Sequence, residues 1–293
     1  MEYLPAVLCL MKRVVISLAA VLLYLSSSSL APAQTKRALV IGIGEQKDPA
    51  WQKINGDKDV PYVLELLNNA GYGQVITLIN DEATKDGIVS AFQKLAQSCQ
   101  KDDIVYVHFS GHGQQMSDVD GDETDDGLDE CWIPYDAYRR PCDEDRGEKH
   151  LIDDEVNMLL TNVRDKIGSR GKMLVVVDAC HSGDATRGDS ETVRGVQDVF
   201  ESENQVRLVN PYEERWITLS ACASDQVNAE MKKPAVGKLT YAIYVNVNKG
   251  KALNNDEFYS SLRVFMKLNS ASRPQRPEMT GETGKYGIAD FLF

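Results

Sequence analysis

A cysteine and a histidine lie in this chain where they could act together on a carbonyl group. His112 follows an apolar run at 104–109, and Cys180 follows another at 173–177, so each comes just after a segment typical of a buried strand. A cysteine attacks a carbonyl as the thiolate, which requires a lowered pKa or a nearby base. An imidazole can stabilise the thiolate and later protonate the leaving amine. These residues predict nucleophilic catalysis, with Cys180 as nucleophile and His112 as general acid–base.

Glycines surround both residues and leave room for a substrate backbone. Gly111 and Gly113 flank His112, and Gly183 lies beyond Cys180. The backbone N–H groups of Gly113 and Cys180 are the predicted donors to the oxyanion.

The elements that would position this pair alternate between strands and helices. Strands are predicted at 38–43, 75–79, 104–109, 173–177 and 216–219, with a last strand at 286–293. Helices are predicted at 60–70, from Thr84, from Asp153, at 238–247 and at 255–266. Long loops are predicted at 113–131, 136–150 and 183–215. This order predicts one α/β domain over residues 34–293, with a mostly parallel sheet covered on both faces.

Sites in open α/β sheets form beyond the carboxyl ends of the strands. If the strands at 104–109 and 173–177 are neighbours, His112 and Cys180 meet at that edge.

Four runs of sequence resemble the caspase/metacaspase superfamily of cysteine peptidases, which share the caspase–hemoglobinase fold. YVHFSGHG at 106–113 and VVDACHSG at 176–183 resemble its two catalytic signatures, and RALVIGIG at 37–44 and LSACASDQ at 219–226 match in kind and order. The resemblance implies a three-layer α/β/α fold with about six strands. It also implies a His112/Cys180 dyad that hydrolyses peptide bonds.

Among these peptidases the chain looks like the bacterial metacaspase type, which implies cleavage after Arg or Lys. The positions that match the family's substrate pocket are Asp178, Ser110, Asp59 and Asp225. Carboxylates in a partly desolvated pocket favour a cationic side chain. Asp59 has an alternative role as a helix cap, and Gly56 replaces a cysteine that the family often has.

The acidic stretch 118–130 does not fit the register of an EF-hand, and a solvated loop is its simplest interpretation. The family resemblance nevertheless implies calcium activation, with Asp129, Asp153 and Asp154 as ligands and Asp184 or Asp189 as a fourth. Asp153 and Asp154 could equally balance the dipole at a helix N-terminus. Calcium is the one cofactor expected, and no organic cofactor is.

The predicted loop 183–215 holds several arginines, so an Arg/Lys-specific peptidase could cleave itself there. They are Arg187, Arg194, Arg207 and Arg215. A mobile surface loop is the alternative interpretation.

The N-terminus predicts export. Lys12 and Arg13 precede an apolar run at 14–25, and Ala31 and Ala33 form an A-x-A cleavage pair, as in a secretory signal over residues 1–33. The apolar run is shorter than the ~20 residues of a membrane-spanning helix. We expect a secreted or periplasmic protein without a stable membrane anchor.

Net charge and cysteine content limit which binding partners and metal ions are expected. A net charge of −12 argues against non-specific nucleic-acid binding and suits cationic partners such as peptides with Arg or Lys. The cysteines lack paired C-x-x-C units, which argues against zinc. Cys131 and Cys142 could form a disulfide.

Two other functions are compatible with parts of this sequence. A clostripain- or gingipain-like peptidase would share the His-Gly and Cys signatures, but the acidic inserts favour the metacaspase type. A non-catalytic caspase-like scaffold should lack His112 or Cys180, and both are present.

Overall fold

The computed structural model describes residues 34–118, 127–180, 192–196, 198–202, 214–223, 226–250, 254–270 and 275–293. Residues Thr35–Phe293 form one compact unit. The predicted signal segment lies outside the described residues. Among the helices that are described, none has the length and apolar character needed to cross a membrane.

A six-stranded sheet forms the centre of the unit. Its strands are β1 (Lys36–Gly42), β2 (Gln74–Ile79), β3 (Ile104–Ser110), β7 (Lys172–Asp178), β8 (Ile217–Ser220) and β11 (Glu278–Gly281). They lie in the order β11-β8-β7-β3-β1-β2, and β11 alone among them is antiparallel to its neighbour. All seven residues of β3 are buried, as expected for a parallel strand covered on both faces. The predicted mostly parallel sheet is confirmed.

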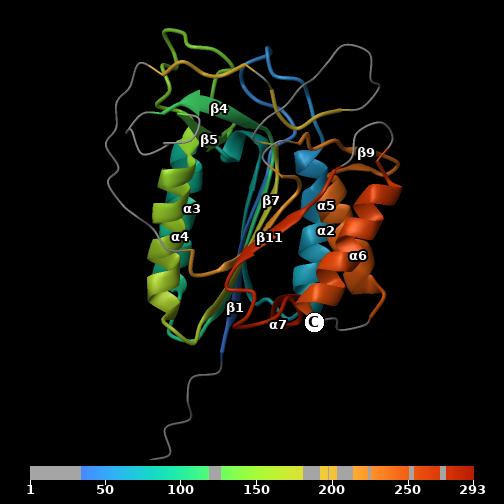
Figure 1. Ribbon diagram of the computed structural model, residues 1–293. Helices are drawn as coiled ribbons and strands as arrows, with labels where there is room; N and C mark the ends of the chain where they lie inside the picture. The colour runs from blue at the N-terminus through green and yellow to red at the C-terminus, as the bar shows by residue number, and fades with distance from the viewer. Residues whose placement is uncertain are drawn as a thin grey trace, which may run out of the picture. The chain divides into compact units, whose positions relative to one another are not determined.

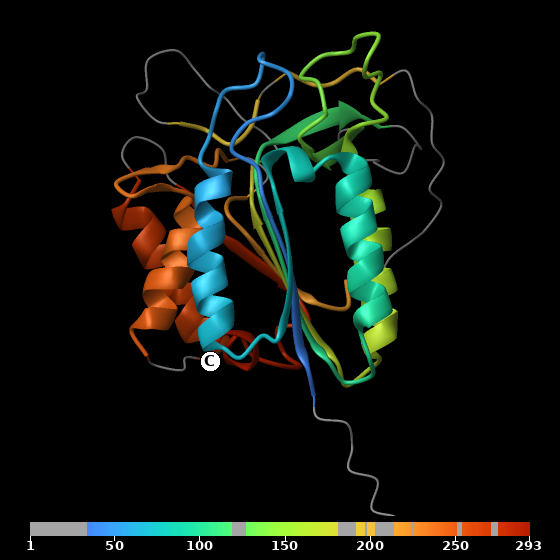
Figure 2. The same ribbon diagram turned by 180° about the vertical axis from the view of Figure 1, so that it is seen from behind.

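Helices cover both faces of this sheet (Figures 1 and 2). On one face lie α3 (Lys85–Ser98) and α4 (Asp153–Ile167); on the other lie α2 (Gly56–Asn69), α5 (Lys238–Asn248) and α6 (Asn255–Leu268). Successive strand residues face opposite sides, so Ala38 and Val40 pack with α2, whereas Leu39 and Ile41 pack with α3. The three-layer α/β/α architecture is therefore confirmed.

Two helices begin where their sequences place a cap. The Thr84 side chain accepts a hydrogen bond from the Gly87 N–H at the start of α3. At the start of α6, Asn254 and Glu257 form a reciprocal capping box. Each cap satisfies backbone donors that the first turn leaves without a helical partner.

The prediction of a loop over 113–131 was wrong at both of its ends. β4 (Gly113–Ser117) and β5 (Leu128–Trp132) pair antiparallel, and β6 (Leu151–Ile152) adds to β5. The sequence GQQMS of β4 lacks the apolar alternation of a strand, yet Gln114 and Met116 are buried. This small sheet packs above the carboxyl edge of the main sheet (Figure 1). A hairpin, β9 (Met231–Lys232) and β10 (Ala235–Val236), is also present.

The C-terminal segment was predicted as a strand over 286–293, and this was wrong. Residues Ala289–Leu292 form a short helix, α7, and the last place in the sheet belongs to β11. Ile288, Phe291 and Leu292 are buried. Their i, i+3, i+4 spacing puts them on one face of a helix rather than of a strand.

Candidate active site

β3 and β7 are neighbours, so the segments that follow them meet at one edge of the sheet. The two strands pair in parallel, with Ser110 opposite Asp178. His112 lies two residues beyond Ser110, and Cys180 lies two residues beyond Asp178. The register therefore brings the predicted dyad residues to equivalent positions just beyond the ends of adjacent strands.

The ring of His112 is held in one orientation. Its Nε2 lies 2.7 Å from the Gln52 carbonyl oxygen, which can only accept, so Nε2 carries the proton. Nδ1 is buried and has no hydrogen-bond partner among the described residues. The Trp51 ring packs against the imidazole, with the centroids 5.0 Å apart. Burial lowers the pKa of His112 to about 4, so at neutral pH the Nδ1 lone pair is available as a base.

Cys180 is fully buried and lies beside a second thiol. The Sγ atoms of Cys180 and Cys222 each lie 3.3 Å from the Gln226 carbonyl oxygen. Hydrogen bonding to Cys180, followed by burial, raises the pKa of Cys222 well above its ordinary value. Cys222 is therefore a thiol held protonated next to the predicted nucleophile.

The two predicted oxyanion donors point at the same oxygen atom. The N–H groups of Gly113 and Cys180 donate to the Arg194 carbonyl oxygen, at 3.2 and 3.0 Å. A pair of N–H groups at these distances from one carbonyl is the arrangement that stabilises an oxyanion. The structure thus brings Cys180 and the residue after His112 to one peptide group.

The side chain of Arg194 lies in a buried acidic pocket. Its Nη1 lies 2.8 Å from Asp59 Oδ2 and 3.4 Å from Asp178 Oδ1, and it donates to Ser110 Oγ at 2.6 Å. Asp59, Ser110, Asp178 and Arg194 are all completely buried. Three of the four predicted pocket residues therefore contact one guanidinium group. The fourth, Asp225, lies outside the described residues.

The N-terminal turn of α5 holds the two aspartates. Thr240 donates to Asp178 Oδ2 from its backbone N–H at 2.8 Å and from its hydroxyl at 2.7 Å, and Gly237 N–H donates to Asp59 at 2.7 Å. Asn228 Nδ2 donates to Asp178 Oδ1 at 2.7 Å. A helix N-terminus favours negative charge, so α5 helps to keep carboxylates in a buried pocket.

The two aspartates differ in their acidity. Burial raises the pKa of Asp59 to about 6, although Arg194 opposes this. Burial also acts to raise the pKa of Asp178, but the charge of Arg194 and the hydrogen bonds from Asn228 and Thr240 outweigh it and lower that pKa. Asp178 is therefore the firmly ionised member of the pair.

Glu230 is a third pocket acid that the sequence reasoning missed. Arg194 Nε donates to Glu230 Oε1 at 3.0 Å, and Nη2 lies 3.0 Å from the same oxygen. Asn55 donates to Glu230 from both its backbone and its side chain. Glu230 belongs to no catalytic signature, and a lone Glu after Ala229 carries no local signal of this role.

Gly56, where the family often has a cysteine, has no space for a side chain. A Cβ atom there would lie 2.4 Å from the Ile43 carbonyl oxygen and 2.5 Å from that of Ser110. α2 begins at Gly56, so Asp59 does not cap this helix. Its side chain contacts Ser110 and Arg194 instead.

The predicted calcium ligands come from two elements. Asp129 lies in β5, and the strand that pairs with β5, β6, leads directly into α4, whose first two residues are Asp153 and Asp154. Within the described residues, no group of three or more His, Cys, Asp or Glu side chains is arranged to hold a metal ion. The alternatives for a fourth ligand, Asp184 and Asp189, lie outside the described residues.

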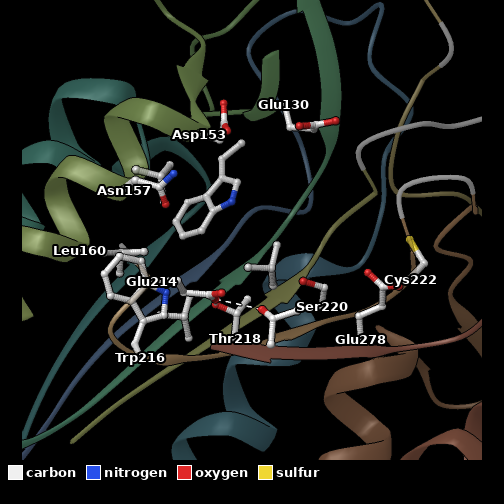
Figure 3. A pocket seen from close by; sticks show the side chains of 15 residues that line it. Glu130, Asp153, Asn157, Leu160, Glu214, Trp216, Thr218, Ser220, Cys222 and Glu278 are labelled. Carbon is white, nitrogen blue, oxygen red and sulfur yellow. Dashed lines mark hydrogen bonds between the residues drawn. The ribbon is translucent and has the colours of Figure 1, made fainter. Parts of the chain in front are cut away.

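An acidic cavity of about 310 Å³ opens between α4, β8 and β11. Four carboxylates line it: Glu130, Asp153, Glu214 and Glu278. Figure 3 shows Asp153 and Glu130 on one side, with Glu278 and Cys222 on another. Asp153 is thus next to a space lined by other acids, and the cavity extends to the thiol beside Cys180. Cys131 and Cys142, which the sequence left open as a disulfide pair, are both free thiols.

The caspase domain family matches residues 35–285, and the chain belongs to this family. The chain is 35% identical over 160 residues to metacaspase-1A of Aspergillus terreus; the match covers 51% of this chain and 36% of that protein. It is 29% identical over 177 residues to metacaspase-1 of Coccidioides immitis, covering 58% of this chain and 35% of that protein. The matched part is thus about a third of the length of these relatives. The expected kinship with caspases and metacaspases is confirmed.

Solved structures show the same fold. A protein from Geobacter sulfurreducens superposes with a TM-score of 0.63 at 21% identity, covering 88% of this chain and 97% of that one. Caspase-1 from Spodoptera frugiperda superposes with a TM-score of 0.60 at 10% identity, covering 86% and 90% of the two chains.

Proposed function

We propose that this protein is a cysteine endopeptidase that hydrolyses peptide bonds after arginine or lysine, with Cys180 as nucleophile and His112 as general acid–base. The observation that carries the proposal is the arrangement around Arg194. Its carbonyl oxygen lies between two backbone donors while its guanidinium lies in an acidic pocket. A substrate arginine would need both contacts at once.

The dyad supports this chemistry atom by atom. His112 keeps its proton on Nε2 through Gln52, so Nδ1 is the atom that takes the thiol proton and later donates it to the leaving amine. The N–H groups of Gly113 and Cys180 stabilise the tetrahedral oxyanion.

Charge and burial support the preference for a basic residue. Asp59, Asp178 and Glu230 lie in a pocket that excludes water, and an unpaired carboxylate is strongly disfavoured there. A cationic side chain relieves this penalty, whereas an aspartate side chain would add to it. We therefore assign the pocket to the residue before the scissile bond.

We also propose that calcium activates the enzyme through Asp129, Asp153 and Asp154. All their side-chain donors are carboxylate oxygens, which suit this ion, and β5, which carries Asp129, pairs with the strand that leads into the start of α4. In such a site these residues would hold the ion, which would fix β5 relative to the start of α4.

Export is proposed from residues 1–33, whose charged, apolar and small-residue order is that of a secretory signal. Secretion followed by mass spectrometry tests it: the processed chain should begin at Gln34.

Peptide hydrolysis tests the function. The chain 34–293 should cleave fluorogenic peptides ending in Arg or Lys, and not the counterpart ending in Asp, with activity rising on addition of calcium and falling in excess chelator. Cys180→Ala and His112→Ala should lower kcat/KM by at least about 10³-fold, since each removes a reacting group. Cys99→Ala, a matched change in a buried cysteine at the end of α3, should keep activity.

The pocket, the dyad and the calcium dependence can each be contradicted separately. Preferential cleavage after Asp would overturn the pocket assignment, and full activity of Cys180→Ala would overturn the dyad. Undiminished activity in excess chelator would remove calcium alone.

A further inference from the structure

We infer that the Arg194–Gly195 peptide bond is a substrate of this protein's own active site, cut by Cys180 of the same molecule. The inference rests on the proposed peptidase function and identifies its first substrate. It assigns one of the four arginines of the predicted loop by geometry.

The backbone of Arg194 lies where a scissile residue must lie. Its carbonyl oxygen accepts from Gly113 N–H at 3.2 Å and from Cys180 N–H at 3.0 Å. The next residue packs directly on the nucleophile: a Cβ atom added to Gly195 would lie 2.9 Å from Cys180 Cβ. The peptide bond that follows Arg194 is therefore in contact with Cys180.

The residues before the bond are bound as an added strand. Arg194 N–H donates to the Asn228 carbonyl at 2.9 Å, and Glu230 N–H donates to the Thr192 carbonyl at 2.8 Å. Val193 lies opposite Ala229 in an antiparallel bridge. Strand addition of this kind is a common way for a protein to hold an extended peptide, because backbone hydrogen bonds fix its register.

The side chain supplies an independent observation. The Arg194 guanidinium is completely buried against Asp59, Asp178 and Glu230. An arginine with a purely structural role could make these ion pairs without its carbonyl reaching two backbone donors beside a cysteine. Arg215, in contrast, forms a partly exposed pair with Asp165 at 2.7 Å.

The chemical step balances with water as the co-reactant. The Cys180 proton passes to His112 Nδ1, and the sulfur attacks the Arg194 carbonyl carbon to form a C–S bond. The C–N bond to Gly195 breaks as His112 returns the proton to the Gly195 nitrogen, which leaves as an amine. Water then hydrolyses the thioester, giving the Arg194 carboxylate and restoring the Cys180 thiol.

The bound segment also excludes other substrates. An external arginine would need the same three carboxylates and the same two N–H groups that Arg194 occupies. Peptide hydrolysis by the uncut chain should therefore begin after a lag.

The test follows the chain itself and a peptide in parallel. Freshly purified chain 34–293 is incubated with calcium and an Arg-ended fluorogenic peptide, and the fragments are identified by intact mass and N-terminal sequencing. The wild type should give a fragment starting at Gly195 with a first-order rate constant that is unchanged over a tenfold range of protein concentration. The lag in peptide hydrolysis should have the same rate constant.

Variants and contrary outcomes separate the two proposals. Cys180→Ala and Arg194→Ala should lose this cut, and Arg215→Ala should keep it. Cleavage only at another bond, an intact chain that hydrolyses the peptide without a lag, or a rate proportional to concentration would overturn the inference and leave the peptidase function standing. If neither chain nor peptide is cut, both proposals fail. The wild-type N-terminal sequence decides the bond even if Arg194→Ala does not fold.

Discussion

Three carboxylates divide the nitrogens of the Arg194 guanidinium between them. Asp59 and Asp178 contact Nη1, whereas Glu230 contacts Nε and Nη2. A lysine side chain carries a single ammonium group. If that group took the position of Nη1, it would have no counterpart of the Nε and Nη2 atoms that contact Glu230. Glu230 is thus the residue that should distinguish arginine from lysine.

Glu230→Gln should lower kcat/KM for an Arg-ended peptide by about 10- to 100-fold, the equivalent of one charge-assisted hydrogen bond. The same value for the Lys-ended peptide should change by less than about threefold, because the ammonium pairs with the two aspartates. Steady-state kinetics on both peptides measure the ratio.

Glu65→Gln serves as the matched control, because Glu65 lies on α2 and accepts an exposed hydrogen bond from the hydroxyl of Tyr244 on α5. Equal losses on the two peptides would contradict the prediction. They would show that Glu230 acts by holding Asn55 and the start of α2 rather than by reading the substrate.

The start of α2 packs so closely against β1 and β3 that its first residue, Gly56, has no room for a side chain. Gly56 begins α2 between the carbonyl groups that end β3 and follow β1. The Ser110 carbonyl is one of the two groups that Gly56 packs against, and the Ser110 side chain contacts Asp59 in the acidic pocket. A shift of the start of α2 would therefore also disturb the pocket.

Gly56→Ala should destabilise the fold by about 2–3 kcal/mol through overpacking, which corresponds to a fall in Tm of roughly 5–10 °C. Thermal unfolding followed by circular dichroism measures it. Gly73→Ala is the control, since a Cβ there meets nothing within 4 Å, and its Tm should stay within about 2 °C. Equal Tm values for the two variants would mean that α2 can shift to make room.

Across the whole molecule, buried histidines set the response to acid. Burial lowers the pKa of His108 and His112 to about 4 and that of His150 to about 3. Between these values and about 6.5 the unfolded chain binds protons that the folded protein does not, so stability falls as pH drops. Asp59 and Asp145 act in the opposite sense, because burial raises the pKa of each and lets the folded form hold their protons, but they are two groups against three.

Lowering the pH from 7 to 5 should therefore reduce Tm by about 10 °C, as the linkage amounts to several kcal/mol. Differential scanning calorimetry at a series of pH values checks this. His150→Gln, which replaces a buried imidazole between Gln114 and Asp145, should flatten the dependence. A Tm that is constant or rises on acidification would show that the histidines titrate freely in the folded state.

The sequence predicted those features that depend on only a few neighbouring residues. Apolar runs marked the five parallel strands, Thr84 marked the start of α3, and the residues after β3 and β7 marked His112 and Cys180. Each depends on backbone period or strand-end position, which a short window of sequence contains.

Other features arise from contacts between residues far apart along the chain. Glu230 meets Asn55 across 175 positions, and Arg194 meets Ser110 across 84. The strand pairing of β4, with its polar sequence, depends in the same way on β5 and Phe200. No local pattern encodes which distant segments pack together, because that choice minimises the free energy of the whole chain; the folded structure therefore supplied the third acid and the arginine it binds.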